Sequence, residues 1–280
     1  KIVFTPIIVL VILVSEAFVG MWINSFIVAV NCVGRVKQRC LSSSDTILTV
    51  LAFSRCCFLL KTTLQTFCST FYPEIYYQNS IFQAFRAVTW FLNSSNQWFA
   101  ACLCVFYCVK IANFSNPLFI CLKFKISRLL PWLLLGSVLL SFLERHYNVN
   151  NVTVETSLSH VLAICGIGFS MAFTVFIISA SLLLFSLLRH TRQMQNNSSR
   201  FRSPCLEAHI QAMKAIISFF FINIVNFIAL LILLTNIYQE ISAASTACTI
   251  IVDACPSVHS IILILSNPKL KKTLIKVLKY

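Results

Sequence analysis

Polar side chains with the potential for chemistry gather inside otherwise apolar stretches of this sequence. Thr89, Asn93 and Gln97 repeat every four residues, with Trp90 and Trp98 beside them. Residues at this spacing share one face of a helix. Hydroxyl and amide groups near aromatic rings can orient a small organic molecule, although the same groups also join membrane helices to one another. The pattern favours a ligand-binding face over interhelical hydrogen bonding.

Two further polar residues, Asn24 and Arg55, stand near the middle of apolar stretches. An arginine that faced lipid would cost several kcal/mol, so we expect Arg55 to face other helices. Two interpretations remain equally open. The residues form either a buried network that can adopt two arrangements or a static packing contact.

Lys61, Gln65 and Thr66 lie in the outer half of the second apolar stretch. The long stem of a lysine favours extension of Lys61 to the membrane surface; the alternative is that it lines a cavity. Residues of the last two stretches could border the same space or a proton path: Asn223, Asn226, Asp253 and His259.

Catalytic patterns are missing from the sequence. It contains no His/Glu metal-ligand spacing, no serine in a nucleophile-elbow context and no glycine-rich phosphate loop. We therefore expect no enzyme, no metal site and no cofactor.

The elements that must position these residues are membrane helices. The chain is 58% hydrophobic and 11% charged, whereas soluble domains are about a quarter charged. A membrane helix needs about 20 apolar residues. The predicted fold class is an all-α membrane protein, a seven-transmembrane helix bundle with a short amphipathic C-terminal helix in one domain over residues 1–280. The expected spans are about 6–33, 46–71, 81–112, 127–147, 161–189, 208–237 and 243–266.

The net charge of +14 follows the connectors between these spans. Basic residues fill the first, third and fifth connectors and the tail, and the alternate connectors are mainly acidic. Since cytoplasmic loops collect Lys and Arg, we expect the amino end outside and the carboxyl end inside a plasma membrane. Nucleic acid binding is not needed to explain the charge. In this topology Asn151 is the glycosylation acceptor that faces outward.

The tail over residues 267–280 carries leucine and valine along one helical face and lysine on the others. This pattern is typical of a helix that lies on the inner membrane surface in contact with lipid.

Several segments resemble the type 2 (bitter) taste receptors, a family of seven-helix G-protein-coupled receptors. The most specific is VFYCVKIANFSNPLFICLK in and after the third span. EAFVGMWINSFI in the first span, LSSSDTILTVLAFSR in the second and HSIILILSNPKLKK in the last are also similar, as are SLLLFSLLRHTRQM and EAHIQAMKAIISF. The resemblance covers essentially the whole chain.

The resemblance implies a receptor for bitter small-molecule agonists that activates a heterotrimeric G protein of the gustducin or inhibitory type. It leaves homo- or hetero-oligomers open. The implied ligand-binding residues, with Asn93 foremost, are Asn93, Thr89, Trp90, Gln97, Lys61, Gln65, Asn226 and Thr249. The implied G-protein face comprises Tyr107, Lys110, His209 and Lys214. Asn24, Arg55 and Ser260 would form a polar network between the first, second and seventh spans.

This chain departs from the family pattern at expected cavity positions. Many relatives carry Trp where Thr89 stands, Asn-Trp where Gln65-Thr66 stands, Tyr at Asn226 and Pro at Ala172. A vomeronasal type 1 receptor shares the architecture, but the third- and seventh-span signatures argue against it. A small-molecule transporter would show two related halves, and the sequence shows no such symmetry. A scaffolding membrane protein would not need a polar third span.

Overall fold

The computed structural model describes residues 4–38, 43–111, 136, 157–197, 204–235 and 243–279. At some helix ends it describes the backbone but not the side chains. The expected fourth span lies almost wholly outside the described residues. Every regular element among the described residues is a helix.

Six of the described helices are long. They are α1 (Phe4–Gln38), α2 (Ser43–Phe71), α4 (Asn79–Ile111), α6 (Ser157–Asn197), α7 (Pro204–Thr235) and α8 (Ala243–Ser266). Two are short, α3 (Pro73–Tyr76) and α9 (Pro268–Val277). The third expected span corresponds to α4, because α3 is a single turn in the connector after α2.

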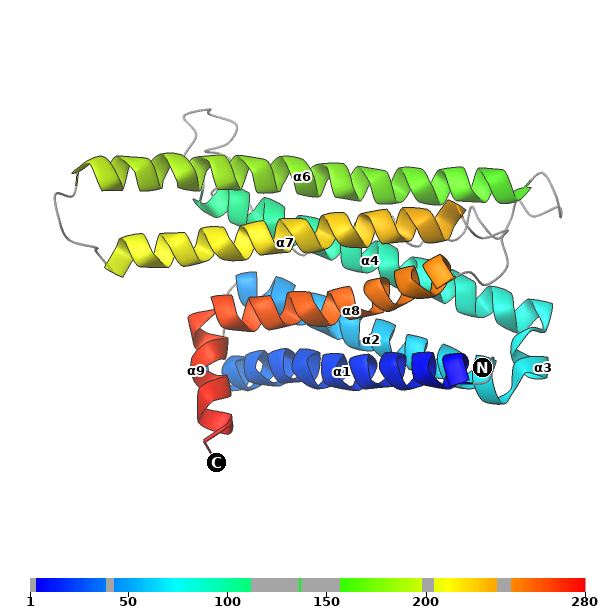
Figure 1. The fold of residues 1–280 in the computed structure, drawn as a ribbon. Helices are drawn as coiled ribbons and strands as arrows, with labels where there is room; N and C mark the ends of the chain where they lie inside the picture. The colour runs from blue at the N-terminus through cyan, green and yellow to red at the C-terminus, as the bar shows by residue number, and fades with distance from the viewer. Residues whose placement is uncertain are drawn as a thin grey trace.

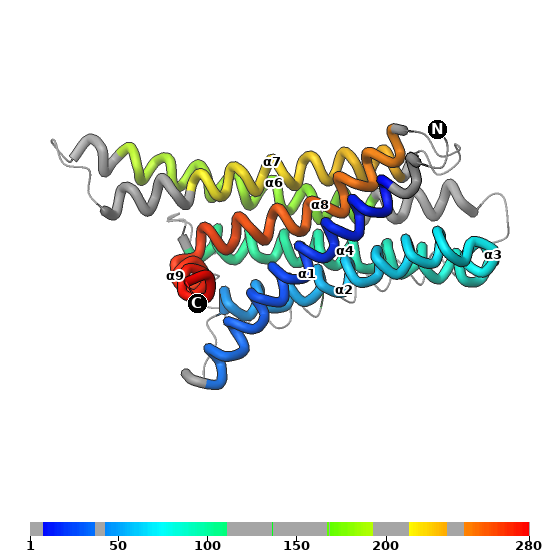
Figure 2. The backbone as a smooth tube through the Cα atoms, turned by 60° about the horizontal axis from the view of Figure 1, so that its bottom comes forward, coloured from blue at the N-terminus to red at the C-terminus, as the bar shows by residue number. Residues whose placement is uncertain are grey.

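The long helices run side by side as a bundle (Figure 1). Helix α1 packs against α2 and α8, α4 packs against α2 and α6, and α7 packs between α6 and α8. Helix α3 and the start of α1 lie at one end of the bundle, while α9 turns across the other end (Figures 1 and 2). Polar residues from α1, α2, α4 and α8 can therefore meet inside the bundle.

Side chains pack inside the bundle in several apolar clusters. One cluster joins Ile47, Leu51, Phe99 and Phe106 of α2 and α4. Large apolar side chains are also abundant on the outside, such as Phe18, which is 69% exposed. Contact of such a surface with water would be unfavourable, whereas contact with lipid tails is favourable. The helices also satisfy their own backbone groups, as spanning segments must.

Five of the described helices are long and apolar enough to cross a membrane: α1, α2, α6, α7 and α8. Helix α4 is long enough, at 33 residues, but its polar residues keep it out of this group. The long helix outside this group is thus the one that carries the Thr89–Gln97 strip.

Local sequence accounts for the turn from α8 into α9. The Asn267 side chain accepts hydrogen bonds from the backbone N–H groups of Lys269 and Leu270, at 3.0 and 3.4 Å. Pro268 follows at the first helical position, where a missing N–H costs nothing. Leu270 is fully buried against residues of α1, α2 and α8, which fixes α9 against the bundle.

Candidate functional site

A buried polar network joins three helices through the Ser260 hydroxyl. The Arg55 guanidinium of α2 donates a hydrogen bond to this oxygen at 2.9 Å. The Asn24 side-chain oxygen of α1 lies 2.7 Å from it, and the Pro256 carbonyl of α8 lies 2.8 Å from it. A hydroxyl has one hydrogen, so Ser260 donates to one of these two acceptors at a time. The structure thus brings Asn24, Arg55 and Ser260 together.

The ring of His259 completes the surroundings of Arg55. Its Nδ1 atom is hydrogen-bonded to the Arg55 guanidinium. Because a guanidinium only donates, Nδ1 is the acceptor and the imidazole hydrogen belongs on Nε2. Nε2 is buried and lacks a hydrogen-bond partner among the described residues. The ring centroid lies 3.6 Å from that of Phe219 on α7, so the network reaches a fourth helix.

Close packing of α1, α2 and α8 depends on a glycine beside this network. The Asn24 amide donates to the Gly20 carbonyl at 2.8 Å. A Cβ atom at Gly20 would overlap the Ser257 hydroxyl and stand 2.6 Å from Leu59 Cδ1. Only a residue without a side chain allows these helices to approach so closely.

A second polar cluster lies nearer the end of the bundle that carries α3. The Lys61 ammonium donates hydrogen bonds to the side-chain oxygens of Gln65 and Thr89. The Gln65 amide donates to the Tyr76 hydroxyl of α3 at 2.8 Å. The expected extension of Lys61 to the membrane surface is wrong, since this residue is 7% exposed. Oxygen atoms from its own helix and from α4 accept two hydrogen bonds from the ammonium inside the bundle.

The remaining expected ligand residues of α4, Trp90, Asn93 and Gln97, are buried or half-buried. Asn93 and Gln97 are 9% and 4% exposed. The Gln97 Nε2 atom has no hydrogen-bond partner in the described part of the chain. The Trp90 ring packs edge-on against Phe169 of α6, with centroids 5.7 Å apart. Helix α4 thus directs polar and aromatic groups into the bundle.

Two expected ligand residues stand on other helices. Asn226 of α7 is half-buried. Thr249 of α8 is half-buried and its hydroxyl bonds the Ser245 carbonyl of its own helix at 3.0 Å. Among the described residues, neither side chain is hydrogen-bonded to the Lys61 cluster.

The expected G-protein residues lie toward the opposite end of α4 and the start of α7. Tyr107 is half-buried between two apolar clusters. Lys110 is exposed, with its ammonium 5.3 Å from the centroid of the Phe106 ring. Lys214 is exposed as well. The side chain of His209 lies outside the described residues.

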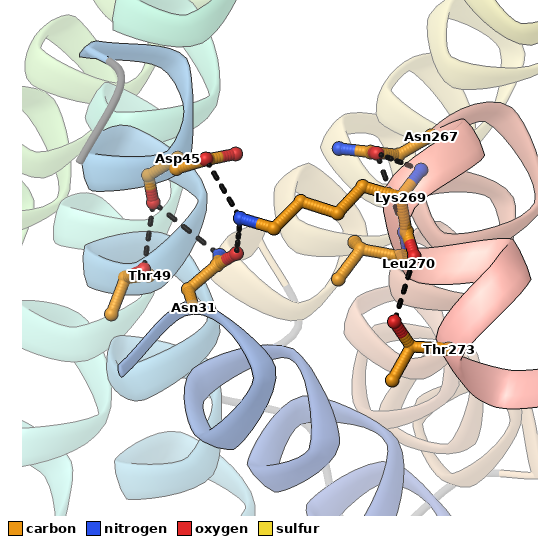
Figure 3. Close-up of polar contacts among 7 residues, drawn as sticks. All are labelled: Asn31, Asp45, Thr49, Asn267, Lys269, Leu270 and Thr273. Atoms are coloured by element: carbon orange, nitrogen blue, oxygen red, sulfur yellow. Dashed lines mark hydrogen bonds and ion pairs between the residues drawn. The ribbon is translucent and has the colours of Figure 1, made fainter. Parts of the chain in front are cut away.

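A contact at this same end escaped prediction from the sequence (Figure 3). The Lys269 ammonium of α9 lies 3.0 Å from the Asp45 carboxylate at the start of α2 and 3.4 Å from the Asn31 oxygen of α1. Lys269 thereby ties α9 to both helices. The sequence feature that could have indicated this contact is Asp45 itself, an acidic residue beside a connector that is otherwise basic.

Catalytic machinery is not visible in the described ranges. They contain no group of three or more His, Cys, Asp or Glu side chains able to hold a metal ion. The polar clusters instead link helices to one another.

Comparison with known proteins decides the family. The family model for "Taste receptor protein (TAS2R)" matches residues 3–280. Taste receptor type 2 member 40 of Gallus gallus is 37% identical over 292 residues, covering 97% of this chain and 94% of that protein. Taste receptor type 2 member 9 of Pongo pygmaeus is 36% identical, covering 97% and 93%. The chain belongs to the TAS2R family.

This taste receptor has the rhodopsin fold. A crystal structure of squid rhodopsin aligns with a TM-score of 0.68 over 97% of this chain and 84% of that chain, at 12% identity. The predicted seven-helix bundle and the bitter-taste G-protein-coupled receptor class are confirmed. The receptor is a multi-pass plasma-membrane protein with small-molecule ligands and G-protein coupling, and the enzyme, pheromone-receptor and transporter alternatives are not favoured.

Proposed function

We propose that bitter agonists bind between the helices near Lys61, Asn93 and Trp90, and that binding activates a gustducin-type heterotrimeric G protein. The observation that carries this proposal is the separation of two polar regions along one bundle. The Lys61 cluster lies toward the end with α3, whereas Lys110 and Lys269 lie toward the end with α9. A ligand at one region and a G protein at the other require a signal along the helices.

The Ser260 network lies between these two regions and supports the transmission step. Its hydroxyl has two acceptors at nearly equal distance, on α1 and on α8 itself. Transfer of this hydrogen between Asn24 and Pro256 would exchange an interhelical bond for a local one. An agonist shifts such an equilibrium only if it binds one arrangement more tightly than the other.

The proposed orientation places the amino end outside and α9 inside the cell. Its support is the charge of α9 and its flanks, which carry exposed lysines such as Lys271, Lys272 and Lys276, because cytoplasmic segments collect basic residues. Exposed Ile275 and Leu278 accompany them, so we place α9 at the inner lipid surface.

Several further features of the proposed receptor rest on the sequence alone. We infer one receptor domain over residues 1–280 with the span limits given above, a glycan on Asn151, and roles for Asn226, Thr249 and His209 at the ligand and G-protein sites. Asn151 lies outside the described residues. Homo- and hetero-oligomers both fit this arrangement.

Calcium release in cells tests the proposed function. The cells would express this chain with a chimeric G protein carrying the gustducin receptor-contact segment, and a panel of bitter compounds would be applied. The expected result is a dose-dependent signal that mock-transfected cells lack. Silence across the panel with surface expression verified, together with silence when other G-protein chimeras are used, would contradict the proposal.

A further inference from the structure

Lys61 is a cation enclosed by the helix bundle. It lies on α2, is 7% exposed and donates hydrogen bonds to Gln65 and Thr89. Both acceptors are neutral oxygens. An ammonium has three N–H donors, so this arrangement leaves one donor for a further partner.

The surroundings fix the position of this ammonium. The Thr89 hydroxyl gives its own hydrogen to the Phe85 carbonyl at 2.7 Å, so its oxygen is free to accept from Lys61. The Gln65 amide nitrogen donates to Tyr76 at 2.8 Å, which leaves the amide oxygen for Lys61. Tyr76 is 4% exposed and packs edge-on against Phe82 at 5.7 Å. The two acceptors are therefore held in place before any ligand arrives.

The charge of Lys61 lacks a contact counter-ion. In the described part of the chain the ion-pair contact is Lys269–Asp45, and none involves Lys61. Asp253 of α8 is also buried but forms no ion-pair contact with Lys61. A buried ammonium without a paired anion is costly, and neutral oxygens offset only part of that cost.

We propose that Lys61 is a specificity-determining residue that pairs with an anionic group, a carboxylate or sulfonate, of a small-molecule agonist. Gln65 and Thr89 are positioning residues that hold the ammonium for this contact. The inference rests on the proposed function, because it names the ligand class for the same outer region. A carboxylate would accept the third N–H bond and supply the missing counter-ion, a charge-assisted bond stronger than a neutral one.

Two other roles for the cluster predict different behaviour. If Lys61 only ties α2 to α4, its loss lowers stability and affects all agonists alike. If the acidic side chains of Asp253 on α8 and of half-buried Glu16 on α1 determine the charge preference instead, cationic agonists bind best and loss of Lys61 improves their potency. Ligands matched in shape but differing in charge separate these possibilities.

The test uses matched ligands in the calcium-release assay. Benzoate, 3-phenylpropionate and diphenylacetate are each compared with their methyl esters and with the corresponding primary amines. The receptors are the wild type, Lys61→Met, Lys61→Arg and the exposed-site control Lys271→Met, with surface levels measured by an amino-terminal tag. Because Lys61→Met could fail to reach the surface, Thr89→Val and Gln65→Leu are included.

For the wild type we expect at least one acid to be roughly ten-fold or more potent than its ester, the size of one charge-assisted hydrogen bond. Lys61→Met should bring the acid-to-ester ratio to about one, while Lys61→Arg and Lys271→Met keep it. Thr89→Val and Gln65→Leu should reduce the ratio at unchanged surface level.

Three outcomes would overturn the inference. Esters or amines that are as potent as acids on the wild type exclude an anionic ligand group. An acid preference that persists in Lys61→Met, Thr89→Val and Gln65→Leu shows that another residue binds the anionic group. Silence toward these ligands while the broad bitter panel still activates the receptor rejects the ligand class alone. Silence toward both, with every G-protein chimera, rejects the proposed function as well.

Discussion

The Arg55 guanidinium donates a 2.9 Å hydrogen bond to the Ser260 hydroxyl, joining residues 205 positions apart in the sequence. Both side chains are almost fully buried. A buried arginine in a membrane bundle requires partners on neighbouring helices, and Ser260 with His259 supplies them. This contact connects α2 to α8 at the point where α1 joins through Asn24.

Replacement of Ser260 by Ala should destabilise the receptor. It removes the oxygen that Arg55 and Asn24 share and leaves buried polar groups without that partner, which costs about 1–3 kcal/mol. Thermal unfolding of the purified receptor measures this loss. Ser266→Ala is the matched control, because the exposed Ser266 hydroxyl donates to the Ile262 carbonyl of its own helix. Equal melting temperatures for the two variants would contradict the expectation.

Replacement of Gly20 by Ala should lower both stability and surface expression. The added methyl would meet Ser257 and stand 2.6 Å from Leu59 Cδ1, and overpacking of this kind costs about 1–3 kcal/mol. Gly34→Ala is the control, since its Cβ would approach only the flexible end of Lys269 at 3.3 Å. The tag signal at the cell surface should fall for the first variant much more than for the second. A larger loss of surface signal for Gly34→Ala than for Gly20→Ala would contradict this expectation and show that α1 can shift to accommodate a methyl group at Gly20.

Replacement of Asn93 by Ala should weaken activation by most agonists. A neutral hydrogen bond contributes about 0.5–1.5 kcal/mol, equivalent to roughly two- to ten-fold in potency. Half-maximal concentrations across a broad panel measure the shift. Thr174→Ala is the control, because that exposed hydroxyl donates to the Ser170 carbonyl of its own helix, α6. Unchanged potency across the panel for Asn93→Ala would remove Asn93 from the ligand site.

Replacement of Lys110 by Ala should leave agonist binding intact and reduce coupling. Lys110 is exposed at the end of α4, where its charge is available to an acidic partner surface. Agonist competition binding and nucleotide exchange on the G protein separate the two effects. Lys110→Arg keeps the charge and should keep coupling. Retained exchange by Lys110→Ala at equal surface level would exclude this residue from the interface.

Replacement of Lys269 by Met should loosen α9 with little effect on overall stability. Its side chain is 41% exposed, and pairs at such sites contribute about 0–1 kcal/mol. Hydrogen exchange of the α9 backbone amides should nevertheless become faster, because the link to Asp45 and Asn31 is lost. Lys271→Met, at an exposed position on the same helix, is the control. Identical protection in both variants would show that Leu270 alone holds α9.

Sequence patterns predicted the helical class because apolar length and the distribution of basic connectors are one-dimensional properties. The Ser260 contacts could be expected only through the family resemblance, since no local pattern connects positions 24, 55 and 260. The contact between Asp45 and Lys269 could not be predicted for the same reason. Their charges lie 224 positions apart, and the angle of α9 that brings them together depends on burial of Leu270.

The prediction that Lys61 extends to the membrane surface was wrong, because the position of its side chain depends on a neighbouring helix. A lysine stem reaches the membrane surface when nothing nearer accepts its hydrogen bonds. Here Thr89 of α4 provides such an oxygen, and only the packing of α2 against α4 reveals it. The polar strip of α4 was recognisable from its four-residue spacing, whereas its partners were not.

Agonist-stimulated nucleotide exchange is the most direct test of a receptor that links the outer ligand region to a gustducin-type G protein. The purified receptor in lipid nanodiscs would be mixed with a purified gustducin-type heterotrimer and an agonist found in the cell assay. We predict that GTP uptake rises with agonist concentration and that Lys110→Ala lowers the rise without changing agonist binding. Agonist binding without any increase in GTP uptake by the wild-type receptor would contradict the proposed coupling.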